Sequence, residues 1–482
     1  MSLDAQSRGY RSEELLYGLN DRPPVLPALL AAIAHLLAIV AGIATAPLLI
    51  ARGLNLDVAT TAYVIGAAFV ISGLATLIQV VRIGLIGSGL LSIQGTSFSF
   101  IGVLIYAASL LDDSHLGAAE GLGVLLGSGI VGGLMTVVAG FYIQRLARVI
   151  TVNVTGVTIF MLGASLVWSA WQNFQWTLAS TYNAGAATQQ TLWVCLQAGV
   201  VIGVIGLLAS SRSPWLRLLS ICTGLGVGVC VAFLTTGLEG EIAMTGTELL
   251  LPRWQPFPLG VHPGVVLVLL PIFLVSMMES VGDLTATSLL SRCEVSGAPY
   301  WRRIRGGIVA GGLNSIGAAL AGTFPITTFS QNNAVIQLTG VASRLVGVLV
   351  ALLLIVLGML PQFVALFQLM PGGVLHAVSG LLFAMIAWAG LRLLRLQAGS
   401  TLNLRTQGMR MLIGCGTAAV ALSFLPELAQ SLGFLLPTYL SILLNFPVAT
   451  AAVLAIFWEW LVSASPDVNP LPVSIGSDPD GN

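Results

Sequence analysis

Long stretches without a charged residue dominate the sequence, and they limit the folds that are open to the chain. They recur along almost the whole length, at 25–51, 58–81, 83–111, 121–144, 149–211, 218–238, 254–278, 306–343, 345–391, 411–426 and 428–458. A helix crosses the hydrocarbon of a bilayer in about 20 residues, so several of these stretches can hold two spans. Only 8% of the 482 residues are charged, against about 25% in a soluble domain. We therefore expect an all-α polytopic membrane protein.

The remaining composition argues against several classes of function. The 19 basic and 19 acidic side chains cancel, which leaves no polybasic surface for nucleic acid. The five cysteines lie far apart without paired spacing, so we expect neither a disulfide framework nor a metal site. The motifs His-Glu-x-x-His, Cys-x-x-Cys and Gly-x-Ser-x-Gly do not occur. We expect neither an enzyme nor a cofactor.

Division of the long stretches at polar residues, glycines and prolines predicts about fourteen transmembrane segments. They lie near 25–50, 58–80, 84–110, 120–143, 149–169, 191–210, 216–236, 263–290, 306–322, 327–341, 345–360, 373–394, 409–426 and 433–461. With the N-terminus inside, all but two of the 19 arginines, Arg52 and Arg253, fall on the cytoplasmic side. Positive residues are retained on that side during insertion. Both termini are therefore predicted to be cytoplasmic, in a multi-pass plasma membrane protein.

Fourteen segments divide into two sets of seven. The predicted domains are a cytoplasmic N-terminal tail at 1–24, a first repeat at 25–236, an extracytoplasmic linker at 237–262, a second repeat at 263–461 and a cytoplasmic C-terminal tail at 462–482. An odd number of spans in each half makes the halves inverted in the membrane. In transporters built this way, short or interrupted segments at matching positions mark the substrate site.

Two such segments occur, each third in its half. One contains the stretch Gln94 to Phe100, and the other opens with the stretch Pro325 to Asn333. Both are rich in hydroxyl and β-branched residues and are bordered by glycine or proline, which disfavours helix. Backbone that leaves the helix inside a membrane normally lines a buried cavity. We therefore predict extended stretches at a binding site, with two chance Ser/Thr-rich helices as the alternative.

Glu279 and Asp283 lie within the eighth segment, four residues apart and so on one helix face. Charge in mid-membrane costs on the order of 3 kcal/mol, which makes intramembrane acids functional candidates. Burial favours the neutral form of a carboxylic acid, as a proton carrier requires. The alternative is that the helix ends earlier and water reaches both acids. His35 lies in the middle of the first segment. That segment is equivalent to the eighth, so His35 and Glu279 are expected at similar depths in the membrane. His35 is either a structural hydrogen-bonding group or a proton carrier.

The stretch from Gln331 to Gly340 resembles the signature of the nucleobase–ascorbate transporters. That signature reads glutamine, glutamate or proline, then asparagine, any residue, glycine, four residues of any kind, threonine, and arginine, lysine or glycine. The match continues to Arg344, as in bacterial xanthine permeases. Other landmarks follow in family order. They are Tyr17-x-Leu19-x-Asp21-Arg22-Pro23-Pro24, Gly87-Ser88-Gly89-Leu90-Leu91-Ser92-Ile93-Gln94 and Glu279-x-x-Gly282-Asp283 with Thr285-Ala286-Thr287.

The resemblance implies a seven-plus-seven inverted repeat. A core would contain segments 1–4 and 8–11, and a gate segments 5–7 and 12–14, in a homodimer that moves substrate by an elevator-like shift. It further implies that Glu279 and Gln331 hold the edge of a purine ring, that Phe98 packs on its face and that His35 supports binding. Asp283, together with Glu279, would serve proton coupling. Ser97, Ser330 and Asn332 complete the expected substrate site.

The sequence departs from the family pattern at three positions. The signature glycine is Ala334, an acid common in segment nine is replaced by Gly311, and Ile326 stands where relatives often have asparagine. These changes put the substrate range and the proton network in question. The expected function is proton-coupled import of a purine, foremost xanthine, across the bacterial inner membrane. The alternatives are a urate or broader purine transporter, a sulphate-class anion transporter and a membrane sensor that does not transport.

Overall fold

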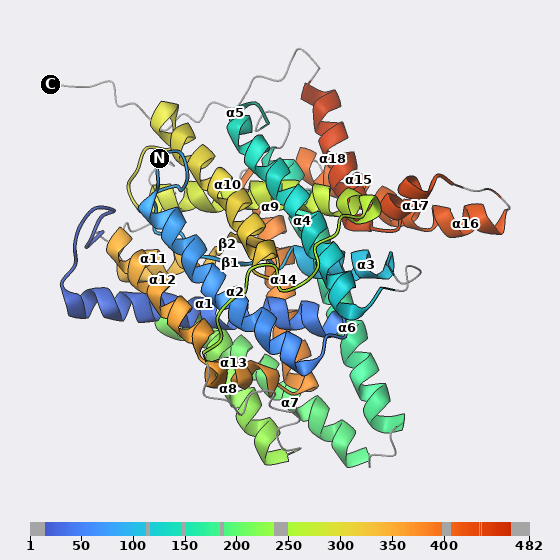
Figure 1. Ribbon diagram of the computed structural model, residues 1–482, viewed down its shortest axis with the longest axis horizontal. Coiled ribbons are helices and arrows are strands. Elements are labelled where there is room, and N and C mark those ends of the chain that lie inside the picture. The colour runs from blue at the N-terminus through green and yellow to red at the C-terminus, as the bar shows by residue number, and fades with distance from the viewer. Residues whose placement is uncertain are drawn as a thin grey trace, which may run out of the picture.

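The structure is a computed structural model that describes residues 15–111, 116–146, 151–183, 188–235, 249–397, 406–432, 434 and 436–463. Most of the predicted N-terminal tail, half of the predicted linker and nearly all of the predicted C-terminal tail lie outside these residues. The described chain is helical apart from one sheet of two short strands, β1 and β2. The helices form a bundle around this sheet (Figure 1).

The elements of the first half, up to residue 235, are α1 Val25–Gly53, α2 Val58–Val81, β1 Gln94–Thr96, α3 Phe100–Ser109, α4 Ala118–Phe141, α5 Ile143–Leu146, α6 Val152–Asn183, α7 Thr188–Ala209 and α8 Pro214–Thr235. Those of the second half are α9 Pro263–Leu290, α10 Gly297–Leu320, β2 Ile326–Thr328, α11 Gln331–Thr339, α12 Arg344–Met359, α13 Pro361–Gln368, α14 Gly372–Gln397, α15 Gln407–Ser423, α16 Leu425–Ser431, α17 Thr438–Leu444 and α18 Pro447–Ser463. Each half thus contains one strand followed at once by a short helix.

Each of the fourteen predicted segments overlaps a described helix, a strand with the helix after it or, for the last segment, the two helices α17 and α18. By length and apolar composition, eight described helices can span a membrane, or ten if each bent pair counts as one span. The chain is therefore a multi-pass membrane protein, and the count of fourteen stays a prediction. Some helices extend beyond the predicted spans. The fifth segment was expected to end at 169, whereas α6 continues to Asn183, and the ninth was expected to begin at 306, whereas α10 begins at Gly297.

Prolines produce the bends within the predicted spans. The pair α12 and α13 bends by 77° at Pro361, and the pair α17 and α18 bends by 94° at a break that ends at Pro447. Proline lacks the N–H that would continue the helical ladder and sterically blocks the preceding turn. Other helices start at side-chain caps. The carboxylate of Asp57 accepts hydrogen bonds from two N–H groups of α2, and the hydroxyl of Ser343 accepts one from α12.

Glycines allow the closest helix pairs to pack. In the contact between α6 and α14, a Cβ on Gly390 would lie 2.4 Å from the backbone nitrogen of Phe160, and one on Gly163 would lie 2.2 Å from that of Ala387. The pair α2 and α12 shows the same close approach at Gly73, where a Cβ would lie 2.5 Å from the carbonyl oxygen of Ala351. Small residues bring helix backbones together where lipid offers no hydrophobic driving force.

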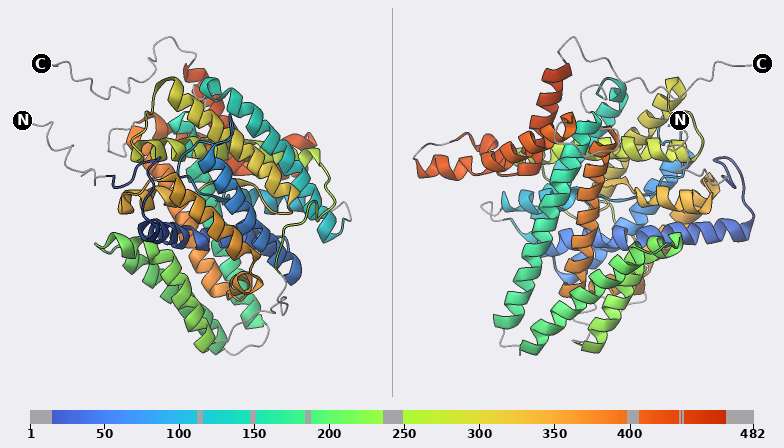
Figure 2. Two further views of the ribbon diagram at one scale, coloured as in Figure 1. Left: turned by 60° about the vertical axis from the view of Figure 1, so that its left-hand side comes forward. Right: turned by 180° about the vertical axis from the view of Figure 1, so that it is seen from behind.

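The two views of Figure 2 show how these helices are grouped. Helices α1, α2, α9 and α10 contact the strands, with α4 packed on α10 and α12 packed on α2. Helices α6, α7, α8 and α14 form a second group of long helices, and α15 to α18 lie at one side (Figure 1). The helices around the strands contact the second group through α1 with α8 and α9 with α6, and they contact the third group through α9 with α18.

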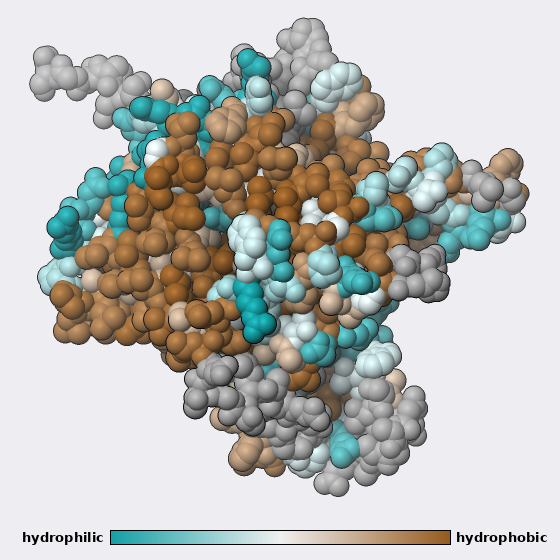
Figure 3. Space-filling view, viewed as in Figure 1, coloured by the Kyte–Doolittle hydropathy of each residue, from teal (hydrophilic) through white to brown (hydrophobic). Residues whose placement is uncertain are grey.

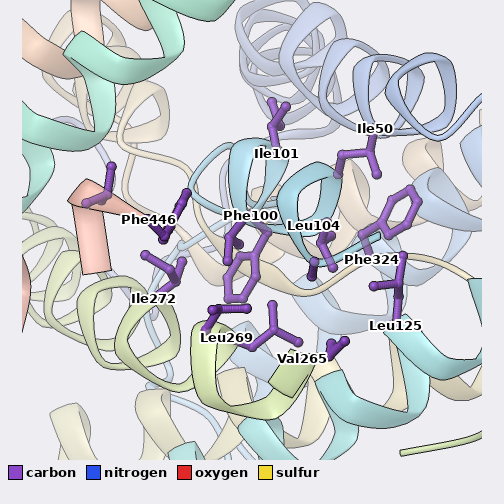
Figure 4. Packing of buried hydrophobic residues seen from close by; sticks show 14 of the residues in the cluster. Ile50, Phe100, Ile101, Leu104, Leu125, Val265, Leu269, Ile272, Phe324 and Phe446 are labelled. Atoms are coloured by element: carbon purple, nitrogen blue, oxygen red, sulfur yellow. The ribbon is translucent and has the colours of Figure 1, made fainter. Parts of the chain in front are cut away.

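The hydrophobic packing around α3 fixes the first short helix in place. Figure 4 shows Phe100 and Leu104 of α3 packed with Val265 and Leu269 of α9. The ring of Phe100 also meets that of Phe273, with centroids 4.6 Å apart. The face in Figure 3 carries broad hydrophobic areas, and hydrophilic residues lie along its upper left edge, through its middle and at its right. Such a surface suits contact with lipid.

Candidate functional site

The site is built on the antiparallel pair of strands β1 and β2. Gln94 pairs with Thr328, Gly95 with Thr327 and Thr96 with Ile326. These stretches come from opposite halves of the chain, and both were predicted to leave the helical conformation. That prediction is confirmed, and the alternative of two chance helices is wrong.

Hydroxyl groups of flanking helices satisfy the outer edges of the two strands. The backbone N–H of Gln94 donates to Oγ1 of Thr76 on α2, at 2.9 Å. The backbone N–H of Ile326 donates to Oγ of Ser315 on α10, at 3.1 Å, and this hydroxyl returns a hydrogen bond to the carbonyl of Ile326 at 3.2 Å. The outward backbone groups of Gln94 and Ile326 thus have partners without water, as backbone outside a helix requires inside a membrane protein.

Each strand leads into a short helix whose N-cap is a serine, Ser99 for α3 and Ser330 for α11. Neither hydroxyl caps its own helix. Instead, Ser99 donates to Oε2 of Glu279 at 3.3 Å, and Ser330 donates to Oδ1 of Asp283 at 2.7 Å. The two acids of α9 thus contact the beginnings of both short helices, one acid to each.

Asp283 makes the denser set of contacts. Its Oδ2 accepts a second hydrogen bond from Oγ1 of Thr328, at 2.8 Å, so both carboxylate oxygens are engaged by β2 and the start of α11. Glu279 accepts from Ser99 alone among the described hydrogen bonds, and its side chain is half-buried. α9 runs to Leu290, so both acids lie inside the helix. The alternative, that the helix ends before them, is wrong.

The asparagines of α11 hold this helix against its neighbours. Nδ2 of Asn332 donates to the carbonyl of Leu91 at 2.5 Å, and the Asn332 side chain lies beside the imidazole of His35. His35 is fully buried, and neither of its ring nitrogens has a hydrogen bond of good geometry among the described residues. His35 of α1 and Asn332 of α11 therefore lie together, and both are buried.

The side chain of Gln331, the first residue of α11, is half-buried. It makes no hydrogen bond within the described part of the chain, so both ends of its amide are free to bind another molecule. Ser330 beside it is exposed, as are Ala334 and Gln337 further along α11. The start of α11 is thus accessible even though Asn332 is buried behind it.

Phe98 follows β1 and borders the site with two other rings. Its centroid lies 6.0 Å from that of Phe329, which follows β2, and 6.4 Å from that of Phe383 on α14. Phe98 is half-buried whereas Phe329 is buried, so Phe98 retains accessible ring surface. Ser97 is buried, and its backbone N–H donates to the carbonyl of Pro325 at 3.0 Å, which extends the strand pair.

Sequence reasoning missed several residues that complete this arrangement. Oγ1 of Thr287 donates to Oδ1 of Asn333 at 2.6 Å, which ties α9 to α11. Thr328 and Ser99 bind the acids directly. The resemblance between Thr96-Ser97-Phe98-Ser99 and Thr327-Thr328-Phe329-Ser330 was a usable signal, because it places Ser99 and Ser330 at equivalent positions.

The three departures from the family pattern lie in different surroundings. Ala334 is on the exposed face of α11. Gly311 faces open space, since a Cβ there would meet no atom within 4 Å. Ile326 is buried and packs with Ala75 and Ala318, so its side chain belongs to the packing behind the strands.

An antiparallel strand pair, two short helices beginning at it and two intramembrane acids define a multi-pass membrane transporter. Residues 27–423 match the profile of the permease family. The chain belongs to the nucleobase–ascorbate transporter family, and it is a transporter rather than an enzyme.

Relatives and solved structures agree with this assignment. The chain is 37% identical over 453 residues to the xanthine permease XanQ of Escherichia coli, covering 93% of each protein. It is 35% identical over 425 residues to the xanthine permease XanP of the same organism, covering 88% of this chain and 91% of that one. The fold resembles the transmembrane domain of the cyanobacterial bicarbonate transporter BicA, with a TM-score of 0.58 at 15% identity over 83% of this chain and 96% of that one.

Proposed function

We propose that the chain imports a purine nucleobase together with protons, and that xanthine is the substrate. The observation that carries this proposal is the arrangement of Glu279 and Asp283, each of which accepts a hydrogen bond from the N-cap serine of a different short helix. The names of the bacterial relatives, which are xanthine permeases, supply the substrate.

The chemistry of a purine matches the accessible side chains. An oxidised purine ring presents alternating N–H and carbonyl groups at its edge. The Glu279 carboxylate can accept N–H groups, and the Gln331 amide can both donate and accept. The accessible ring of Phe98 can stack on the heterocycle. We assign Ser330 and Ser97 to the wall of the site, and Asn332 with His35 to the support behind α11.

Glu279 and Asp283 are proposed to carry the coupled proton. Ionisation of both carboxylic acids on one face of a membrane helix is energetically unfavourable, because a nearby like charge and burial each favour the neutral form. Hydroxyl donors at both acids can stabilise a carboxylate in the state that has lost its proton. No cofactor other than the coupling ion enters the proposal.

The proposed architecture is a seven-plus-seven inverted repeat in a bacterial inner membrane. Both termini are on the cytoplasmic side. It is supported by the strand and short helix that occur once in each half and by the antiparallel pairing of the strands. A homodimer and an elevator-like movement of the core against the gate complete the proposal. Reporter fusions at each terminus test the orientation, and a periplasmic signal at either end contradicts it.

Uptake of radiolabelled xanthine into cells that lack their own purine permeases tests the function. We expect saturable uptake that a protonophore abolishes. Uptake that is insensitive to the protonophore would contradict proton coupling. If the protein is inserted in the membrane but takes up no xanthine, then xanthine is not its substrate.

The substitution Glu279→Gln tests the central residue. Loss of a hydrogen bond to a charged group costs about 1.5–3 kcal/mol, or roughly 10- to 100-fold in affinity. The matched control is Glu294→Gln, which makes the same chemical change at an exposed side chain. We expect normal membrane levels of both variants and loss of uptake in the first alone. Equal uptake by the two variants would show that Glu279 has no part in transport.

A urate or broader purine range is the second candidate. It is favoured by a 31% identity over 402 residues, covering 78% of this chain and 70% of the other, to the uric acid-xanthine permease of Emericella nidulans. Competition of labelled xanthine uptake by unlabelled urate separates the two, because only the broader transporter is inhibited. Competition by sulphate or bicarbonate would favour an anion transporter, and binding without flux in proteoliposomes would favour a sensor.

A further inference from the structure

Three arginine side chains converge on the loop between α2 and β1, away from the site described above. We call Arg82, Arg303 and Arg344 the arginine cluster. Nε of Arg344 donates to the carbonyl of Gly89 at 2.6 Å. A Cβ placed on Gly89 would lie 2.8 Å from Nη2 of Arg344 and 3.5 Å from Cδ of Arg82. Both side chains therefore pass directly beside the backbone of Gly89.

The third member, Arg303, is on the first turns of α10. Its Nη1 donates to the backbone carbonyl of Glu294 at 3.1 Å. The charges of Arg82 and Arg303 both act on the Arg344 guanidinium, as does the thiol of Cys293. Within the described ranges no carboxylate lies within ion-pair distance of the cluster. The three positive charges therefore repel one another, and a bound anion would offset that repulsion.

The loop that carries Arg82 is held in a fixed shape. Arg82 has a φ of 57°, a left-handed conformation that is uncommon for a residue with a side chain. The backbone N–H of Gly87 donates to the carbonyl of Gly306 on α10 at 2.9 Å. The loop thus joins α2 to α10, and Arg344 joins it to α12. Backbone carbonyls hold the guanidinium groups of Arg344 and Arg303 in place, and the fixed backbone of the loop directs the Arg82 side chain past Gly89.

Exposed apolar side chains lie beside the cluster on the same loop. Ile83 is 62% exposed and Leu85 is 56% exposed. Arg82, Arg303 and Arg344 all belong to the cytoplasmic set in the predicted orientation, where the membrane surface carries anionic lipids. Guanidinium groups pair with phosphate oxygens in a fixed geometry, and apolar neighbours suit the region where head groups meet acyl chains.

We propose that the arginine cluster binds the phosphate group of an anionic phospholipid, with Ile83 and Leu85 against its acyl chains. The lipid would neutralise the repulsion among the three arginines and hold α2, α10 and α12 together at one membrane surface. A free phosphate ion offers the same charge to the arginines but gains nothing from the apolar side chains. The proposal does not depend on which substrate the protein carries.

Binding of added lipid to the full-length protein in neutral detergent tests the proposal. The probes are phosphatidylglycerol, phosphatidylcholine and inorganic phosphate, and the measurements are the number of bound lipids by native mass spectrometry and the unfolding temperature. The variants are Arg82→Gln, whose side chain makes no described hydrogen bond, and Arg303→Gln, whose hydrogen bond to Glu294 is also lost. Arg344 is kept because its hydrogen bond to Gly89 holds the loop itself. The matched control is Arg302→Gln, an exposed arginine next to Arg303 that lies outside the cluster.

We expect phosphatidylglycerol to bind the wild type and Arg302→Gln equally and to raise their unfolding temperatures. Its affinity should fall about fivefold in each cluster variant, in keeping with the contribution of one arginine near an anionic surface. The proposal is overturned if phosphatidylcholine binds equally well, if inorganic phosphate gives the same stabilisation, or if Arg302→Gln loses as much affinity as the cluster variants. The last result would mean that overall charge attracts the lipid.

Discussion

The substitution Thr76→Val examines how an extended strand is stabilised inside the membrane. Oγ1 of Thr76 accepts the backbone N–H of Gln94 at 2.9 Å, and both residues are almost completely buried. Valine has nearly the shape of threonine but no acceptor. The substitution therefore leaves no cavity, and its main effect is to deprive one backbone N–H of its partner.

The expected magnitude follows from this single lost contact. A buried donor without a partner costs about 1–3 kcal/mol. The pairing of β1 with β2 does not use this N–H, so we expect the rest of the sheet to persist and the free energy of unfolding to fall by about 1–3 kcal/mol. The strand is also expected to move, which should weaken substrate binding because Phe98 and Ser99 follow it directly.

Thermal unfolding of the purified protein in detergent measures the effect, with Thr158→Val as the matched control. Thr158 is as completely buried as Thr76, but its hydroxyl only donates to the carbonyl of Val154, four residues before it on α6. That carbonyl keeps its helical hydrogen bond in the control. We expect Thr76→Val to unfold several degrees below Thr158→Val. Equal unfolding temperatures would refute the claim that helix hydroxyls stabilise the strand edges.

Three further predictions follow from the described contacts. Ser99→Ala removes the one described hydrogen bond to Glu279. It should lower the apparent affinity for substrate about tenfold, measured by uptake kinetics, and leave the stability unchanged. An unchanged KM would contradict this prediction. In Gly95→Val, the Cβ would lie 2.2 Å from Cε2 of Phe329, so the ring must move, and we expect loss of uptake in a protein that still inserts. Asp57→Ala should cost about 0.5–2 kcal/mol at pH 7, as the loss of a helix cap does. Hydrogen bonds from Thr60 hold the pKa of Asp57 below its usual range. The loss of stability in Asp57→Ala relative to the wild type should therefore be present at neutral pH and shrink as the pH falls through that lowered pKa. A loss that grows on acidification would refute this account.

The sequence by itself determined the class of structure and the elements of the site. A charge-free stretch of about 20 residues is long enough to cross a bilayer, and in lipid its backbone N–H and carbonyl groups find partners within the stretch only if it is a helix. The same constraint made the non-helical stretches at Gln94 and Pro325 conspicuous. The spacing of Glu279 and Asp283 placed both acids on one helix face. These conclusions needed only local information, namely hydropathy, helix propensity and periodicity.

The helix boundaries were less accessible to sequence reasoning. α6 continues past 169 through polar residues such as Gln172, Asn173 and Gln175. Their polarity suggested the end of a span, but polarity alone does not end a helix. α10 begins at Gly297, before its charge-free stretch, because arginines on its first turns are compatible with helix even where they are not compatible with hydrocarbon.

The tertiary structure decided which groups meet. The pairing of β1 with β2 joins positions more than 200 residues apart, and it brings Ser99 to Glu279 and Ser330 to Asp283. Hydrogen bonds from Thr76 and Ser315 to the strand edges are equally non-local. No local pattern encodes such contacts, because they depend on how whole helices pack. The sequence therefore identified the acids and the broken segments, and only the folded chain assigned each acid its partner.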